Sequence, residues 1–539
     1  MGLGRALAVA LVGLDGHLVQ VEVDVAAGLP AFSLVGLPDT SLSEARDRVR
    51  AAMANAGCAL PSRRITVNLS PAALPKTGTS FDLAVAAGLL AATGAVDAGA
   101  VARCVHLGEL GLDGRLQRVR GVLPAVRAAV RVGRTRFVVP VGNLAEARLV
   151  PGAQVVAARW LPDVVALHRG EPLPDPPPEI PGWDAPVGPG SAPGAAGGGG
   201  PSAPGGTPAQ DGCRPERAAE PDLADVVGQA QARHALEVAA AGGHHLLLVG
   251  PPGAGKTMLA ARLPGLLPDL DDDEALEVTA VHSVAGTLDP AVGLLRRPPF
   301  EDPHHTATVT ALVGGGSGLP RPGAASRAHR GVLFLDEAAE FDARALDALR
   351  QPLEAGELVI HRALGSARFP ARFQLVLAAN PCPCGLAAGR GDDCSCTPLA
   401  RRRYLNRLSG PLLDRVDLQV EVLAVSRAEM TSAVAPEPSI AVAARVRVAR
   451  QTQRTRLRGT PWTTNAEVPG SWLRGPLRLG RAMTVDLDRG LDRGALTIRG
   501  YDRVLRMAWT IADLEGRAAP ARDDVGRALL LRQRGRVPA

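Results

Sequence analysis

Lysine is almost missing from this 539-residue sequence. Of the 60 basic side chains, only Lys76 and Lys256 are lysines, and all the others are arginines. A lysine kept in such a chain marks a position where a compact ammonium group is needed rather than a planar guanidinium. This contrast draws attention to Lys256, which lies in a glycine-rich stretch near the middle of the chain.

Long apolar runs are also absent. No run approaches the roughly 20 residues that a membrane-spanning helix needs, and residues 1–28 alternate apolar and polar side chains without the pattern of a cleavable signal. We therefore expect a cytoplasmic protein with no membrane partner. Four of the seven cysteines fall between Cys382 and Cys396. This distribution argues against a disulfide framework and favours reduced thiols or a metal site.

The positive charge is unevenly distributed. The formal net charge is +6, but from Arg401 onward 26 arginines face 14 acidic residues, so this part carries +12 and the rest of the chain −6. Such an excess suggests a polyanion as partner, although an arginine-rich solvated surface is the commoner explanation. Aromatic residues make up only 3% of the chain. They leave few platforms for base stacking, so DNA would be held through its backbone with little sequence specificity.

A complete phosphate-binding motif lies near the middle of the chain. Residues 250–257 have the pattern G-x-x-x-x-G-K-T between a predicted buried strand, 245–249, and a predicted helix, 258–263. The backbone N–H groups can surround a phosphate chain, Lys256 can reach the outer phosphates, and the Thr257 hydroxyl can ligand Mg²⁺. The sequence therefore predicts ATP and Mg²⁺ as cofactors. The predicted ATP-binding residues are Gly250, Pro251, Pro252, Gly253, Ala254, Gly255, Lys256 and Thr257.

Two further apolar runs end in the polar side chains that ATP hydrolysis requires. Asp336 and Glu337 follow the run at 331–335, and Asn380 follows the run at 374–379. Asp336 would hold the Mg²⁺ shell together with the P-loop threonine, and Glu337 would polarise the attacking water. Asn380 is suitably placed to sense the γ-phosphate or to orient that water. These three residues are the predicted partners of the P-loop.

Composition and periodicity divide the chain into four parts of a multidomain α/β protein. Residues 1–170 alternate predicted strands and helices, as in an α/β or α+β domain, and residues 171–217 are a Pro/Gly-rich stretch expected to be a disordered linker. Residues 218–425 carry the P-loop on a parallel-sheet core and begin with a clasp, 225–241, where an adenine ring could sit. Residues 426–539 are predicted to be mainly helical. The elements expected in the first and last parts are strands at 18–25 and 65–69 and helices at 41–56, 81–92, 441–458, 501–514 and 523–534.

One stretch of the first part resembles the nucleophile segment of Lon-type serine proteases. This stretch is Leu74–Ser80, and Ser80 falls where the nucleophile of that family would be. The segment 114–123 resembles the one that supplies the general-base lysine of the family, but the matching position is Leu123. A serine without a base is a poor nucleophile, and Lys76 is the only substitute base in view. We therefore expect a Lon-like fold that is not a protease.

Five stretches resemble the motifs of one family. They are residues 250–257, 297–305, 313–316, 331–337 and 404–417. Together they resemble the YifB/ComM family of magnesium-chelatase-like AAA+ ATPases, and the resemblance covers nearly the whole chain except the linker. It implies a Lon-like (S5-like) first domain, a chelatase-type AAA+ core and a helical carboxy-terminal lid.

The resemblance also implies a function. It implies a hexameric, ring-forming ATPase, which in this family can be a DNA helicase that drives branch migration in recombination or natural transformation. The implied partners are further copies of the chain, DNA and recombination proteins. Arg415 would be the arginine finger that reaches the γ-phosphate of a neighbouring subunit. Arg499 would be sensor two, which contacts the nucleotide from the lid.

Two insertions would project toward the central pore of such a ring. They are residues 303–316 and 353–362, and DNA that threads the ring would touch them. The first carries His304 and His305, which could contact phosphate or a metal, although neighbouring loop histidines are more often simply exposed. The runner-up function is a chelatase-like or chaperone-like ATPase that remodels a protein complex. A Lon-like ATP-dependent protease is a third class, which Leu123 disfavours.

The clustered cysteines could form a zinc site. A C-x-C pair, nine intervening residues and a second C-x-C pair could supply four thiolates to Zn²⁺. This is not the usual C-x₂-C spacing, and free cytosolic thiols are the alternative. The candidate zinc ligands are Cys382, Cys384, Cys394 and Cys396.

Overall fold

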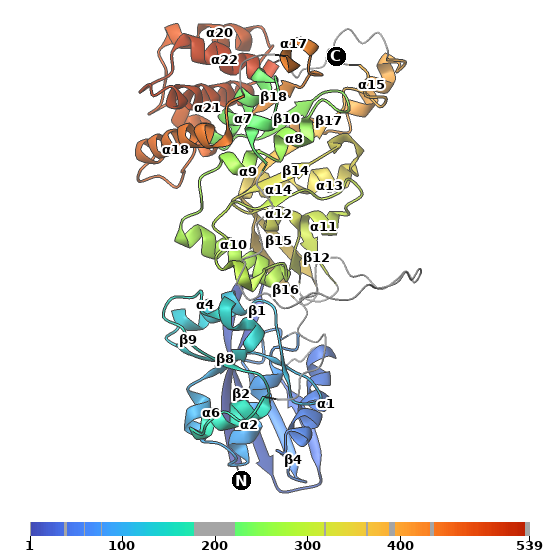
Figure 1. Cartoon of the computed structure of the whole chain (residues 1–539), viewed down its shortest axis with the longest axis vertical. Coiled ribbons are helices and arrows are strands. Elements are labelled where there is room, and N and C mark those ends of the chain that lie inside the picture. The colour runs from blue at the N-terminus through green and yellow to red at the C-terminus, as the bar shows by residue number, and fades with distance from the viewer. Residues whose placement is uncertain are drawn as a thin grey trace, which may run out of the picture.

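The computed structural model describes residues 2–36, 40–58, 60–76, 78–176, 221–316, 320–362, 365–387, 394–431 and 436–533. Most of the predicted linker, from residue 177 onward, lies outside these ranges. The chain forms an elongated molecule, with the amino-terminal unit at one end and the carboxy-terminal helices at the other (Figure 1). No helix within these ranges is both long enough and apolar enough to cross a bilayer.

The first unit is built on a seven-stranded mixed sheet. The strands of this sheet are β1 (Gly2–Val12), β2 (Asp15–Ala26), β3 (Ala31–Val35), β4 (Arg64–Ser70), β5 (Val105–His106), β8 (Arg136–Pro140) and β9 (Gln154–Ala158), and β6 (Glu109–Leu110) and β7 (Leu116–Gln117) form a separate small hairpin. The order in the large sheet is β3-β4-β2-β1-β5-β8-β9. The helices are α1 (Thr40–Asn55), α2 (Asp82–Ala92), α3 (Ala98–Ala102), α4 (Val122–Arg131), α5 (Leu144–Ala147) and α6 (Leu161–Arg169).

The pattern of apolar residues explains which side chains of the first unit are buried. The side chains of Val19, Val21 and Val23 are fully buried because every second position of β2 faces the core. Helix α2 is buried at every residue, as expected for a helix that is apolar all round. The strands predicted at 18–25 and 65–69 and the helices predicted at 41–56 and 81–92 are confirmed as β2, β4, α1 and α2.

A buried histidine pair joins β5 to α6. The Nε2 atoms of His106 and His168 lie 2.9 Å apart, a distance that needs one N–H between them. Burial, with a smaller contribution from the His168 ring, lowers the pKa of His106 to about 3. Burial also lowers the pKa of His168. Both rings are therefore neutral in the folded chain at neutral pH.

Acidification from about pH 7 to about pH 4.5 is expected to destabilise the first unit. In the unfolded chain histidine takes up a proton near pH 6.5, whereas folded His106 stays neutral down to about 3. Between these values the unfolded state binds more protons, so the unfolding free energy falls as the pH falls, by about 1.4 kcal/mol per pH unit for His106. Thermal unfolding as a function of pH measures this slope. A His106→Gln/His168→Gln variant should show a shallower slope, and equal slopes would contradict the assignment.

The second unit contains a five-stranded parallel sheet. The strands are β10 (Leu246–Val249), β11 (Phe300–Glu301), β14 (Val332–Leu335), β17 (Gln374–Ala379) and β18 (Leu418–Glu421), in the order β11-β14-β17-β10-β18. All neighbouring strands run parallel. The segments that follow β10, β14 and β17 therefore meet at the carboxyl edge of one sheet, where ligands bind in open α/β folds. This mixed α/β structure with a parallel-sheet core is consistent with an AAA+ chelatase-like fold.

Helices and two hairpins surround this sheet. The helices are α7 (Ala230–Gly242), α8 (Lys256–Ala260), α9 (Leu263–Leu266), α10 (Asp272–Ala285), α11 (Val309–Val313), α12 (Ala324–Arg327), α13 (Ala343–Ala348), α14 (Arg350–Ala355), α15 (Pro398–Leu405), α16 (Gly410–Leu413) and α17 (Arg427–Met430). The hairpins are β12 (Gly314–Gly315) with β13 (Arg321–Pro322), and β15 (Glu357–Arg362) with β16 (Gly365–Pro370). The insertion expected at 353–362 thus continues to Pro370.

The carboxy-terminal part is helical. It consists of α18 (Ser439–Arg456), α19 (Gly470–Leu473), α20 (Arg481–Asp492), α21 (Ile498–Leu514) and α22 (Arg522–Gln533). Helices α18 and α21 pack against α7 beside the sheet, and Val442, Val446 and Ala449 of α18 are buried there. The helices expected at 441–458, 501–514 and 523–534 are confirmed as α18, α21 and α22.

The first unit rests on α10 and on the β15–β16 hairpin (Figure 1). The Ser283 hydroxyl of α10 donates to the buried Glu146 carboxylate at 2.5 Å, and the Gly121 amide donates to the Ser283 carbonyl at 3.2 Å. At the hairpin, a Cβ added to Gly13 would lie 2.6 Å from the Arg368 carbonyl oxygen. The two units are therefore in direct contact through the part of the second unit that carries the insertions.

Candidate active site

The P-loop joins the end of β10 to the start of α8. Gly253 and Gly255 have φ angles of +75° and +91°, a backbone conformation that L side chains rarely adopt. A Cβ at Gly250 would lie 2.1 Å from the Val422 carbonyl oxygen, so the loop passes too close to the segment after β18 to accept a side chain there. These glycines shape a loop whose N–H groups can face a phosphate chain.

Lys256 is buried at the base of this loop. Its Nζ donates to the carbonyl oxygens of Gly250 at 2.8 Å and Pro251 at 2.9 Å, and to Asn380 Oδ1 at 3.1 Å. Burial lowers the pKa of Lys256, and the nearby Asp336 and Glu337 carboxylates oppose this effect. The contact with Asn380 brings the residue that follows β17 to the P-loop, where the apolar run at 374–379 predicts it.

The two carboxylates that follow β14 take different partners. Asp336 accepts a hydrogen bond from the Thr257 hydroxyl at 2.6 Å, so the two predicted Mg²⁺ ligands lie side by side. Glu337 has a φ angle of +49°, a strained conformation for a residue other than glycine. Its carboxylate lies 3.1 Å from His305 Nδ1. Of the two histidines in the first insertion, His305 thus contacts the carboxylate predicted to activate water.

The two predicted functional arginines lie together, at a distance from this P-loop. Arg499 donates to Asp414 at 2.9 Å, and Arg415 pairs with Glu354. Both line a cavity of about 240 Å³ with Arg503 and Arg506. Burial lowers the pKa of Arg415, and the nearby Arg350, Arg499 and Arg503 lower it further. An anion in this cavity would relieve that crowding of like charges.

This arginine cavity lies at the opposite edge of the sheet from the P-loop. The cavity includes His245, the residue before β10, whereas the P-loop follows β10. The four-residue strand between them spans about 13 Å of buried backbone. Neither Arg415 nor Arg499 therefore lies beside the nucleotide site of its own chain.

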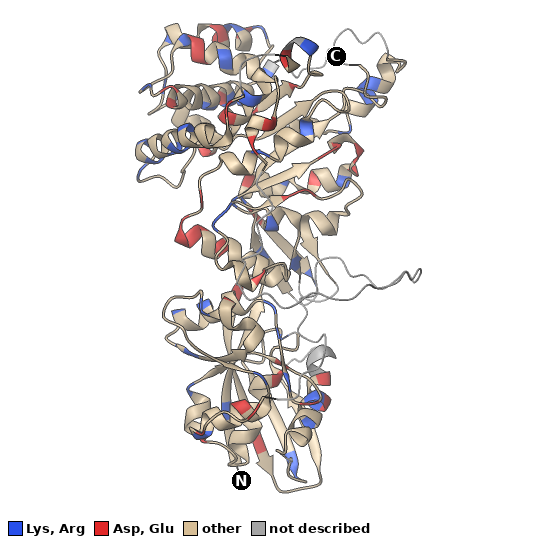
Figure 2. Ribbon diagram, in the orientation of Figure 1, with Lys and Arg blue, Asp and Glu red and all other residues tan. Residues whose placement is uncertain are grey.

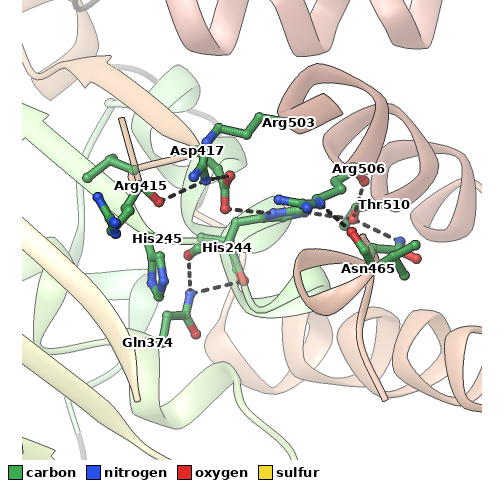
Figure 3. Close-up of polar contacts among 12 residues, drawn as sticks. His244, His245, Gln374, Arg415, Asp417, Asn465, Arg503, Arg506 and Thr510 are labelled. Atoms are coloured by element: carbon green, nitrogen blue, oxygen red, sulfur yellow. Dashed lines mark hydrogen bonds and ion pairs between the residues drawn. The ribbon is translucent and has the colours of Figure 1, made fainter. Parts of the chain in front are cut away.

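A buried polar network holds the arginine cavity against the carboxy-terminal helices (Figure 3). Asp417, which precedes β18, pairs with Arg503 of α21 and lies 3.2 Å from His244 Nδ1. His244 Nε2 lies 2.8 Å from the Thr510 hydroxyl of α21, which accepts from Asn465 at 3.0 Å. Burial alone would raise the pKa of Asp417, but Arg503 and His244 hold it well below its ordinary value.

Local sequence patterns do not reveal this network. Asp417 ends the stretch 404–417 that resembles the family, and His244 directly precedes the predicted strand 245–249, but neither pattern names Arg503 or Thr510 as a partner. The only local signal was a charged residue immediately before an apolar strand, and such residues usually face solvent.

Lys76, the substitute base considered for Ser80, is held by backbone carbonyl groups. Lys76 is fully buried, and its Nζ donates to the carbonyl oxygens of Gly36 at 2.9 Å, Pro71 at 2.5 Å and Leu74 at 3.0 Å. Burial lowers the pKa of Lys76, yet three carbonyl acceptors match the three donors of an ammonium group. The backbone N–H of Leu123 donates to Glu146 at 3.0 Å. Lys76 thus acts as a structural cation, and Leu123 shares the Glu146 carboxylate with Ser283 of α10.

Comparison with known sequences agrees with the resemblance noted above. The family model described as "Magnesium chelatase, subunit ChlI" matches residues 222–430, "Subunit ChlI of Mg-chelatase" matches residues 21–143, and the ChlI C-terminal model matches residues 436–532. The protein YifB of Escherichia coli is 40% identical over 94% of this chain and 92% of its own length. The chain belongs to the YifB/ComM family. The competence protein ComM of Haemophilus influenzae is 41% identical over 96% of this chain and 94% of its own length.

Another YifB/ComM relative, an uncharacterised protein of Mycobacterium tuberculosis, is 52% identical over 99% of each chain. Membership of the YifB/ComM family, together with the P-loop geometry, is consistent with an ATPase that uses ATP and Mg²⁺. The residues present fit these cofactors, because the phosphate loop, Thr257 and Asp336 offer the amide donors and oxygen ligands that a nucleotide and Mg²⁺ require.

Proposed function

We propose that this protein is an ATP-driven motor that assembles as a ring and acts on DNA. The observation that carries the proposal is the position of Arg415 and Arg499 at the sheet edge opposite the P-loop. Because neither lies beside its own P-loop, each would complete the nucleotide site of a neighbouring chain. Heterologous contacts of this kind form a ring when the rotation between neighbouring chains closes, and a closed hexamer is the assembly that we propose.

In this site the chain's own residues would divide the work of hydrolysis. Lys256 and the P-loop amides would hold the phosphates, and Thr257 and Asp336 would hold Mg²⁺, which supplies charge neutralisation for the β- and γ-phosphates. Glu337 would take the proton of the attacking water after its contact with His305 is released. Asn380 would orient that water, and Arg415 would stabilise the developing charge from the neighbouring chain.

Exposed arginines support DNA as the polymer on which the motor acts. Arg362 and Arg368 are exposed on the β15–β16 hairpin, where Arg368 also lies 3.6 Å from the Glu357 carboxylate. Arg402 and Arg403 are exposed on α15, which carries no acidic residue. On α20 and α22, in contrast, basic and acidic residues occur together (Figure 2), and Arg522 of α22 pairs with Asp486 of α20. Helix α18 has no acidic residue, but its Arg445 and Arg456 pair with carboxylates of other segments. The hairpin and α15 are therefore the surfaces that we propose for phosphate contacts. A role in recombination, with recombination proteins as partners, would follow from that activity.

The ATPase rate with and without DNA tests this proposal. Single-stranded DNA and a four-way junction are expected to raise the rate, and the stimulation should decline between about 50 and about 200 mM salt because phosphate contacts release counterions. Arg362→Ala/Arg368→Ala should lose stimulation and keep the basal rate, whereas Arg103→Ala, an exposed arginine of the first unit, should change neither. A basal rate that no DNA alters would favour the alternative, an ATPase that remodels a protein complex.

A further inference from the structure

Four cysteine thiols converge beside the P-loop. Cys382 and Cys384 follow β17 and Asn380, and Cys394 and Cys396 precede α15. The four Sγ atoms all lie within 4.8 Å of one another. The Sγ atom of Cys382 is 3.3 Å from that of Cys384 and 3.6 Å from that of Cys394. Two segments that are separate in sequence thus present one compact set of sulfur atoms.

The spacing of these sulfur atoms fits a single tetrahedral metal ion. A disulfide would bring two of them to about 2.05 Å, well inside the observed separations. Four thiolates at about 2.3 Å from one Zn²⁺ ion would lie about 3.8 Å apart along each edge of the tetrahedron. Thiolate ligands select zinc over the hard cation Mg²⁺. We propose that Cys382, Cys384, Cys394 and Cys396 bind one structural Zn²⁺ ion.

The position of this zinc site gives it a role in the ATPase. Cys382 lies two residues after Asn380, whose side chain accepts from Lys256 at 3.1 Å. Gly385 has a φ angle of +78°, and a Cβ there would lie 2.5 Å from Pro252 Cδ. The segment after β17 is therefore packed directly against the P-loop. Zinc would fix this segment to the start of α15 and so hold Asn380 and the P-loop in their relative positions.

Metal content tests the site directly. The full-length chain, purified under reducing conditions without chelator, is expected to carry about one zinc per chain. Cys384→Ser and Cys396→Ser, which change exposed or half-buried residues, should each lose most of this zinc. Cys58→Ser and Cys104→Ser, which change free cysteines of the first unit, should keep all of it. Circular dichroism of each variant separates loss of metal from loss of fold.

Cobalt provides a second readout that does not depend on ATPase activity. Co²⁺ exchanged into the reduced protein should give the intense visible bands of a tetrahedral thiolate site, and Cys384→Ser should weaken them. Reduced wild-type protein that holds no zinc and takes up neither Zn²⁺ nor Co²⁺ would overturn the proposal. Full zinc content in a folded Cys384→Ser/Cys396→Ser double variant would also overturn it.

The role beside the P-loop rests on the proposed ATPase and has its own readout. Removal of zinc is expected to reduce the ATPase rate, and added Zn²⁺ should restore it. A zinc-containing protein without any ATPase activity would leave the metal site standing and refute the proposed function. If the ATPase rate were the same with and without bound zinc, zinc would have no role in ATP hydrolysis. The metal site itself would still stand on the metal analysis.

Discussion

Glu337→Gln is expected to slow ATP hydrolysis by about two to four orders of magnitude, because loss of a general base typically costs that much. The amide cannot accept the proton of the attacking water, yet it has nearly the size of the carboxylate. The P-loop, Thr257 and Asp336 remain unchanged, so ATP and Mg²⁺ should still bind. The positive φ angle at position 337 strains the backbone to the same extent whether the residue is glutamate or glutamine.

The measurement pairs a steady-state ATPase assay with binding of a fluorescent ATP analogue. The matched control is Glu340→Gln, which removes a carboxylate three residues further along that pairs with Arg407 at 2.8 Å. This control should retain most of the activity. If Glu337→Gln hydrolysed ATP within a few fold of the wild-type rate, Glu337 could not be the general base. If the variant failed to bind ATP, Glu337 would be needed for binding, contrary to the role proposed for it.

Arg415→Ala is expected to lower the ATPase rate by about 10³-fold or more, the usual worth of an arginine finger. Lys256→Ala should be equally inactive for a different reason, since it loses the phosphate contact in its own chain. An equimolar mixture of the two inactive chains should regain activity. In a ring that mixes at random, about one site in four would combine an intact P-loop with an intact Arg415 from the neighbour.

A second mixture serves as the control for this experiment. Lys256→Ala and Glu337→Gln both damage the same chain's part of the site, so mixing them should restore nothing. Recovery only in the first mixture would show that Arg415 acts on a neighbour. No recovery in either mixture would mean that Arg415 serves its own chain or that the chains do not share sites.

The sequence predicted those parts of the site that local patterns encode. The P-loop, Asp336 and Asn380 each follow an apolar run, and runs of that kind become parallel strands with their ends at one edge. One boundary was less accurate, because the helix expected at 258–263 divides into α8 and α9. Pro264 explains the break, since its ring would clash with the Ala260 carbonyl in a continuous helix.

The parts that could not be predicted depend on contacts between distant segments. The carboxy-terminal helices were predicted from their periodicity, but periodicity does not say which edge of the sheet they cover. The structure places Arg499 beside Asp414 rather than near the P-loop. The contact of Ser283 with Glu146 was equally invisible, because a serine and a glutamate 137 residues apart carry no local pattern.

The buried network around Asp417 has a mechanical consequence. It ties Asp417, which directly precedes β18, and His244, which lies two residues before β10, to α21 through a charge pair and a chain of hydrogen bonds. Separating these groups would leave a buried carboxylate without its partner. The sheet edge and the carboxy-terminal helices must therefore turn together as one rigid block. In the proposed ring, a rotation that follows ATP hydrolysis would therefore take place at the contacts between neighbouring chains. Each arginine cavity would move together with the sheet and carboxy-terminal helices of its own chain.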